Sequence, residues 1–141
     1  MKRTLWAVTF FVLGFLALVA NPASAGDPKA GDPRDRFEGV YAYDDERPPV
    51  HFTMWLSIKG KTIKGRIEEP ATFGDGTSDK LYANFTGTLF GDKVSFKKKY
   101  DGTGGQSHSV PYRGTLDGKT IFGVWKMNGQ SGTWYATSTW K

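Results

Sequence analysis

The sequence predicts an all-β fold: an eight-stranded antiparallel up-and-down β-barrel that follows a cleaved signal peptide. After Ala25 the chain contains 12 Thr and 6 Tyr but only 4 Leu and 5 Ala, a composition that favours strands over helices. Apolar residues also alternate with polar ones in eight successive segments, and several segments are joined by short glycine-containing turns. The 141 residues suit one ordinary domain.

The first 25 residues have the organisation of a secretory signal peptide. A basic start, Met1–Arg3, precedes an apolar run over Leu5–Ala20, and the small residues Ala23 and Ala25 form an Ala-x-Ala cleavage site. A membrane anchor is the alternative, but the helix-breaking Asn-Pro pair after the apolar run argues against it. We therefore expect cleavage after Ala25 and a periplasmic or secreted protein.

Residues 26–36 are expected to be a flexible leader, and residues 37–141 the barrel domain. The leader repeats Gly-Asp-Pro followed by a basic residue and has no apolar residue that could anchor it. Without the signal peptide the chain has 17 Lys and Arg against 14 Asp and Glu. This weak excess does not predict a nucleic-acid partner, and no membrane partner is expected after cleavage. The run Lys97–Lys99 is interpreted as a strand with two solvated lysines and one facing the other side.

Alternation defines each strand in turn. The first strand is expected at Phe37–Tyr43, with Phe37, Gly39, Tyr41 and Tyr43 facing inward, and the second at Val50–Ile58, with Val50, Phe52, Met54, Leu56 and Ile58 facing inward. The third is expected at Thr62–Glu68, with Ile63, Gly65 and Ile67 facing inward, and the fourth at Leu81–Leu89, with Leu81, Ala83, Phe85, Gly87 and Leu89 facing inward. The fifth strand is expected at Lys93–Tyr100, with Val94, Phe96, Lys98 and Tyr100 facing inward, and the sixth at Ser107–Leu116, with His108, Val110, Tyr112, Gly114 and Leu116 facing inward. The seventh is expected at Thr120–Met127, with Ile121, Gly123, Trp125 and Met127 facing inward, and the eighth at Gly132–Trp140, with Gly132, Trp134, Ala136 and Ser138 facing inward.

Connection lengths alternate along the chain. Tight turns are expected at Lys59-Gly60, Gly91-Asp92 and Asp117-Gly118, and longer connections at Asp44–Pro49, Glu69–Lys80, Asp101–Gln106 and Asn128–Ser131. In an up-and-down barrel this alternation places every tight turn at one end and every longer loop at the other. The sequence therefore predicts a closed base and a mouth framed by loops, and closure removes the exposed strand edges. A flat sandwich with glycine bulges remains the alternative.

Several short motifs resemble the calycin group, and within it the avidin and streptavidin barrels. They are Gly39-Val40-Tyr41, Ile63-Lys64-Gly65-Arg66, Val94-Ser95-Phe96-Lys97 and Ile121-Phe122-Gly123-Val124-Trp125, and the likeness spans roughly residues 37 to 140. The resemblance implies a barrel that can hold a ligand, with Phe96 and Trp125 as aromatic walls. The biotin site is not retained: Tyr43 and the Asp44–Pro49 loop stand where the family has ureido-binding Asn and Ser. The short Asn128–Ser131 connection replaces the long loop that carries an interface tryptophan.

The inward aromatic residues supply the candidate ligand-binding set. It comprises Tyr43, Phe52, Phe96, Tyr100, His108, Trp125 and Trp134. Aromatic walls with a few polar tips are typical of small-molecule sites, so we expect an exported, non-enzymatic barrel that binds a small, partly apolar ligand. The alternative is that these side chains fill the interior, which in eight-stranded barrels is only just wide enough for them.

Other functions find less support. Zero cysteines exclude thiol chemistry and cysteine-ligated metals, and the presence of only two histidines argues against a histidine-rich metal cluster. No metal ligands, cofactor or catalytic residues are expected. A remote alternative is a small isomerase or hydrolase that uses His108 with Glu69 as an acid–base pair. A second alternative is an interaction module or inhibitor that binds a basic protein partner through an acidic rim. That rim would comprise Asp44, Asp45, Glu46, Glu68, Glu69, Asp75, Asp79 and Asp101. The sequence leaves the oligomeric state open.

Overall fold

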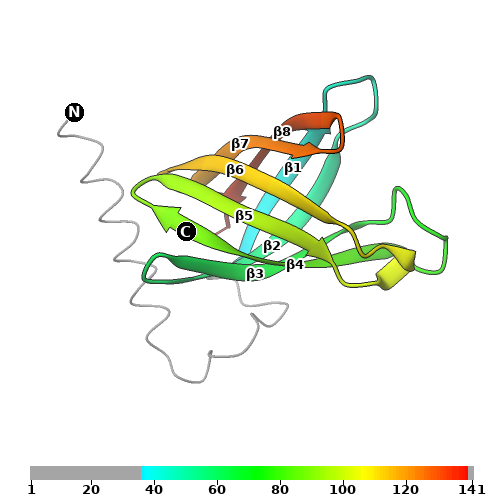
Figure 1. Cartoon of the computed structure of the whole chain (residues 1–141), viewed down its shortest axis with the longest axis horizontal. Helices are drawn as coiled ribbons and strands as arrows, with labels where there is room; N and C mark the ends of the chain where they lie inside the picture. The colour runs from blue at the N-terminus through cyan, green and yellow to red at the C-terminus, as the bar shows by residue number, and fades with distance from the viewer. Residues whose placement is uncertain (1–35, 140–141) are drawn as a thin grey trace.

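The chain folds into a closed barrel of eight antiparallel strands, each paired with its neighbours in chain order and with β1 closing onto β8 (Figure 1). The computed structural model describes residues 36–139, so the predicted signal peptide and residues 26–35 of the leader lie outside the described residues. The strands are β1 (Arg36–Tyr43), β2 (Val50–Lys59), β3 (Thr62–Pro70), β4 (Lys80–Phe90), β5 (Lys93–Tyr100), β6 (Ser109–Asp117), β7 (Thr120–Met127) and β8 (Gln130–Ser138). The predicted fold class is confirmed.

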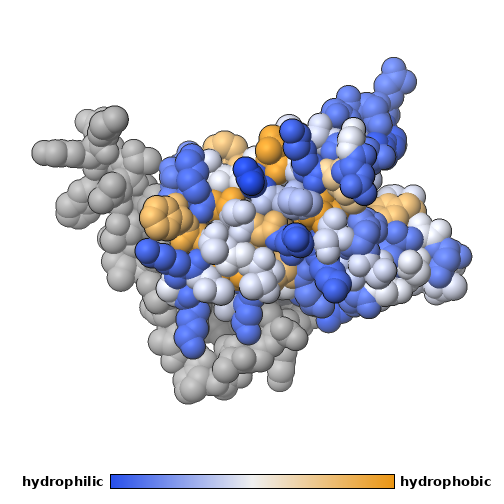
Figure 2. Space-filling model, in the orientation of Figure 1, coloured by the Kyte–Doolittle hydropathy of each residue, from blue (hydrophilic) through white to orange (hydrophobic). Residues whose placement is uncertain are grey.

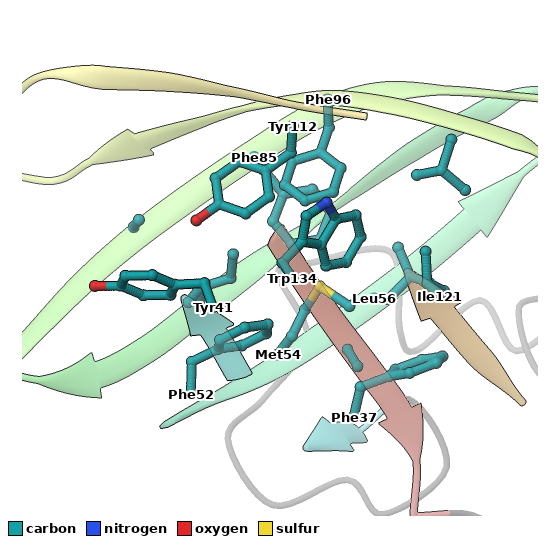
Figure 3. Close-up of a cluster of buried hydrophobic side chains, with 14 of the residues drawn as sticks. Phe37, Tyr41, Phe52, Met54, Leu56, Phe85, Phe96, Tyr112, Ile121 and Trp134 are labelled. Carbon is teal, nitrogen blue, oxygen red and sulfur yellow. The ribbon is translucent and has the colours of Figure 1, made fainter. Parts of the chain in front are cut away.

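Strict alternation determines which side chains enter the barrel. In β5 the burial pattern alternates perfectly, so Val94, Phe96, Lys98 and Tyr100 are buried while the residues between them are exposed. Lys97 and Lys99 therefore face outward and Lys98 faces inward, as the pattern of the lysine run predicts. The other strands follow the same rule, except that Trp55 on β2, between the inward Met54 and Leu56, is also buried. All eight strands contribute to one continuous buried cluster, part of which is drawn in Figure 3.

Two inward glycines allow neighbouring strands to approach closely. A Cβ atom on Gly65 would lie 1.9 Å from the carbonyl oxygen of Trp55, and one on Gly123 would lie 1.9 Å from the carbonyl oxygen of Arg113. No side chain fits at either position unless the backbone moves. These glycines are thus part of what lets a small barrel coil tightly.

Three tight turns lie at one end of the barrel, between β2 and β3, β4 and β5, and β6 and β7, as expected. The three longer loops, between β1 and β2, β3 and β4, and β5 and β6, lie at the other end (Figure 1). The β5–β6 loop includes a short 3-10 turn, η2 (Thr103–Gly105).

The fourth connection at the mouth corrects the prediction. Asn128 and Gly129 form a two-residue hairpin turn between β7 and β8, where a longer loop was expected. Both residues have positive φ, 43° and 79°, the conformation that Asn-Gly adopts in tight hairpins. The mouth is therefore framed by three loops and one tight turn.

Candidate functional site

A cavity of about 450 Å³ opens at the loop end of the barrel. It lies among β1, β2, β5, β6, β7 and β8 and the three long loops, and most of its lining is aromatic or aliphatic. The lining residues are Tyr41, Tyr43, Arg47, Pro48, Pro49, Val50, Thr72, Phe73, Tyr100, His108, Val110, Tyr112, Trp125, Met127 and Gln130. Its size and apolar lining are those of a small-molecule pocket.

Three rings from β1 and β7 form one wall of the pocket. Tyr43 lies edge-on to Trp125 at a centroid distance of 5.4 Å and an angle of 88°, and Tyr41 lies edge-on to both of them. The indole Nε1 of Trp125 donates a hydrogen bond to the carbonyl oxygen of Ala42 at 3.0 Å. Perpendicular packing and this hydrogen bond hold the indole ring in a fixed orientation beside the cavity.

A second aromatic group comes from the end of β5 and from the β3–β4 and β5–β6 connections. The ring of Phe73 lies edge-on to that of Tyr100 at 5.7 Å, and His108 lies 4.7 Å from Tyr100 between centroids. The two connections are joined by a hydrogen bond from the backbone N–H of Asp75 to the carbonyl oxygen of Gly104, at 2.9 Å. The loops thus hold this side of the mouth by contact with each other.

Beneath the pocket lies a buried ion pair. Lys98 on β5 and Glu69 on β3 are 1% and 2% exposed, and the Nζ of Lys98 donates to the Oε2 of Glu69. The hydroxyl groups of Tyr41 and Tyr100 both donate to Oε1, at 3.2 and 2.5 Å. Each carboxylate oxygen of Glu69 therefore has a hydrogen-bonding partner. These hydrogen bonds offset the free-energy cost of burying the charge.

Tyrosine rings separate this pair from the cavity. The Nζ of Lys98 lies 4.9 Å from the ring centre of Tyr41, 4.5 Å from that of Tyr100 and 5.9 Å from that of Tyr112. All three tyrosines line the pocket, whereas Lys98 and Glu69 do not. In Figure 3 the hydroxyl groups of Tyr41 and Tyr112 lie on the same side of the cluster, away from Ile121. The tyrosines form the floor of the pocket and cover the ion pair.

Burial and the nearby carboxylate shift the ionisation of these groups. Desolvation, followed by repulsion from the Glu69 carboxylate, raises the pKa of Tyr41 and Tyr100 far above the ordinary range of tyrosine. The same two causes raise the pKa of Tyr112 well above its usual value. Burial lowers the pKa of Lys98, and the attraction of Glu69 opposes that change. The tyrosine floor is therefore uncharged at neutral pH.

Several polar side chains of the pocket have no hydrogen-bond partner within residues 36–139: besides Tyr43, Thr72 and Gln130, they include the hydroxyl of Tyr112 and the imidazole of His108. Desolvation and the positive charge of Lys98 lower the pKa of His108, so its imidazole is neutral at neutral pH. A neutral imidazole offers one donor and one acceptor, and a phenol can do either. Both groups are free to bond to a ligand.

Arg47 is the one cationic residue among the lining residues described here, and its charge is already matched. Its guanidinium lies over the ring of Tyr43 at 3.7 Å and pairs with the carboxylate of Asp45 at 2.7 Å. Arg47 therefore covers one side of the mouth as a paired, stacked group.

Of the seven residues predicted to contact a ligand, the structure brings four to the cavity: Tyr43, Tyr100, His108 and Trp125. The other three, Phe52, Phe96 and Trp134, do not line it and belong to the buried core. Phe96 stacks on Tyr112 at 5.1 Å and meets Trp134 edge-on at 5.5 Å. The expected alternatives of a filled interior and an open pocket therefore each hold for part of the barrel: the middle is filled and the loop end is open.

The ion pair was not predicted as a unit. Glu69 was expected in the acidic rim because the third strand was expected to end at Glu68, but β3 continues to Pro70. The alternation of Ile63, Gly65 and Ile67 places residue 69 inward once the strand is two residues longer. An acid at an inward position, opposite an inward lysine two strands away, was the signal in the sequence.

The acidic rim is smaller than predicted. Besides the buried Glu69, two of its acids are in ion pairs, Asp45 with Arg47 and Glu68 with Lys80. Asp44, Glu46, Asp75, Asp79 and Asp101 remain exposed and have no ion-pair partner among residues 36–139. The loop end thus keeps a negative excess outside the pocket.

Comparison with models of known protein families gives no match for this chain, and comparison with curated proteins gives none either. The structure is an eight-stranded antiparallel barrel, an architecture that is consistent with a calycin-like barrel. In the described part of the chain, no group of three or more His, Asp or Glu side chains is arranged to hold a metal ion. Nor does that part contain a helix that is long and apolar enough to cross a membrane.

Proposed function

We propose that this chain is an exported, non-enzymatic binding barrel that takes a small, partly apolar ligand through its loop-framed end. The observation that carries the proposal is the cavity of about 450 Å³, which has aromatic walls and several polar side chains with no hydrogen-bond partner within residues 36–139, above a core that is otherwise packed. Aromatic walls contribute most of the binding free energy by burying apolar surface, while a few polar groups orient the ligand. From the resemblance to avidin and streptavidin the proposal takes only the position of the ligand, and not biotin.

Native mass spectrometry of protein purified from its own compartment tests this directly. We expect a retained small molecule, released on denaturation, and a fluorescence change of Trp125 when the empty protein is titrated with the recovered compound. The matched control is Trp134→Phe, which removes an indole in the core and leaves the pocket reporter in place. If neither the purified protein nor a broad panel of aromatic compounds gives a bound species, the proposal is wrong.

The five exposed rim acids support a second candidate, a module that binds a basic protein partner. Replacing Asp44 by Asn and Glu46 by Gln, two of these five acids, would then weaken capture of the partner. Binding through such exposed charges would also weaken as salt is raised. Capture that is insensitive to both changes would contradict this candidate and leave the pocket proposal untouched.

A further inference from the structure

We infer that the pocket selects uncharged ligands, specifically flat aromatic or heteroaromatic molecules that carry a carbonyl, amide or hydroxyl group. The inference rests on the proposed function and concerns the same pocket. It follows from where the charges of the site lie and how each is matched.

The first step concerns the walls. Among the described lining residues the cationic group is Arg47, which is paired with Asp45, and the tyrosine and histidine side chains are neutral. The lining therefore holds no unmatched charge that could compensate a ligand ion. Because a charge buried without a partner loses its hydration, a charged ligand would bind at a penalty.

The second step concerns the floor. The Glu69 carboxylate accepts from Lys98, Tyr41 and Tyr100, and both members of the ion pair have side chains that are 1% exposed. A ligand carboxylate could reach Lys98 only by displacing Glu69, and a ligand ammonium could reach Glu69 only by displacing Lys98. Either exchange leaves an unpaired charge buried, which is strongly unfavourable.

The third step concerns what remains available. The protons of the Tyr41 and Tyr100 hydroxyls are committed to Glu69. Like the side chains of Tyr43, Thr72 and Gln130, the Tyr112 hydroxyl and the His108 imidazole have no hydrogen-bond partner within residues 36–139. These two groups suit an uncharged polar substituent that donates, accepts or does both. The rings of Tyr43 and Trp125 are perpendicular to each other and form an aromatic corner, and the flat body of a ligand can pack against either ring face.

The test compares three probes of nearly the same shape: naphthamide, naphthoate and naphthylmethylammonium. We would measure their binding by titration calorimetry at neutral pH with the chain that begins at Gly26, which contains all eight strands. Naphthamide is expected to bind at least about 10-fold more tightly than either ion. The cation is the stricter comparison, because the exposed rim acids would concentrate it at the mouth.

Two variants test the physical basis. Glu69→Gln keeps an acceptor for the tyrosine hydroxyls but leaves the Lys98 charge unmatched, so the affinity for naphthoate should rise about 10-fold relative to that for naphthamide. Lys98→Met leaves Glu69 unmatched and should shift the preference by a similar factor toward naphthylmethylammonium. Lys97→Met, an exposed neighbour on β5, is the control and should leave all ratios unchanged.

The outcomes are distinct. If a charged probe binds the unmodified protein as tightly as naphthamide does, the selectivity is wrong while the binding function stands. If none of the three probes binds, the result counts against the proposed function, and the selectivity falls with it. Unchanged ratios in a folded Glu69→Gln protein would overturn the role of the ion pair. If that variant does not fold, the ranking of probes on the unmodified protein still decides the inference.

Discussion

Lys98 and Glu69 form an ion pair inside the barrel, with the Nζ of the lysine donating to the Oε2 of the carboxylate. The pair bridges β5 and β3, which are not neighbours in the sheet but are separated by β4. It therefore ties together strands that share no backbone hydrogen bonds. Its stability contribution depends on both partners being present.

Replacing Lys98 by Met is expected to lower the free energy of unfolding by about 3–5 kcal/mol, because a buried carboxylate loses its counter-charge. The double variant Lys98→Met with Glu69→Gln should recover more than half of that loss, since no unpaired charge remains. Urea denaturation measures both. Lys97→Met and Lys99→Met, on the outer face of the same strand, are matched controls that should change stability little. A double variant no more stable than the single one would contradict this account.

Alkaline pH should destabilise the barrel. The pKa values of Tyr41, Tyr100 and Tyr112 are raised in the folded protein, whereas unfolded tyrosines ionise near pH 10. The stability due to these groups is therefore fully present below about pH 10 and is lost as the pH rises above it, by about 1.4 kcal/mol per pH unit for each tyrosine.

Thermal or urea unfolding between neutral and alkaline pH measures this slope. Tyr100→Phe should reduce the loss of unfolding free energy per pH unit by the amount that one buried tyrosine contributes, although it also removes a hydrogen bond to Glu69. Tyr135→Phe is the control, because Tyr135 is 51% exposed on the outer surface. Equal slopes for all three proteins would argue against the buried tyrosines as the cause.

Gly132 on β8 is expected to be indispensable to the pocket wall. A Cβ atom there would lie 1.8 Å from the carbonyl oxygen of Ala42 and 2.6 Å from the Nε1 of Trp125, the two atoms that hydrogen-bond to each other. Gly132→Ala should therefore displace the indole, cost about 1–3 kcal/mol through overpacking and shift the Trp125 fluorescence. The exposed neighbour variant Thr133→Ala should do neither. An unshifted emission spectrum in Gly132→Ala would contradict the tight fit.

The hairpin turn at the mouth offers a separate test. Gly129 has a φ of 79°, which strains any residue with a side chain, so Gly129→Ala should cost about 1 kcal/mol. Asn128→Gly should be nearly neutral, because its φ of 43° is one that glycine adopts readily. Denaturation midpoints of the two variants would show the difference. Equal midpoints would mean that the turn does not hold these angles in solution.

The fold could be predicted from the sequence because side chains along a strand alternate between inward and outward, so alternating apolar and polar residues show which positions face the interior. Strands such as β5 carry the pattern without interruption, so their inward residues were predictable one by one. A longer loop was predicted between β7 and β8, and this prediction was wrong. The polar residues around Asn128 resemble a loop, although Asn-Gly by itself is a strong hairpin signal.

The site was less predictable because it depends on distances that alternation does not specify. Inward position identified Tyr43 and Trp125 but could not say how deep each residue lies, so Phe96 and Trp134 were also expected in the pocket. Phe73 was missed because it comes from a loop that has no periodicity. The inward, buried position of Glu69 was not predicted, because the end of a strand is the least certain part of an alternating pattern.

Closure of the sheet also determines how this protein can associate with others. Because β1 bonds to β8, every strand from 36 to 139 already has a neighbour on both sides, and the described barrel has no edge strand for an extended peptide or another copy to extend. Closure therefore favours association through side chains of the outer surface. The exposed Phe122, Val124 and Tyr135 on β7 and β8 are the apolar ones available there, and substitutions at these positions would change self-association without touching the interior.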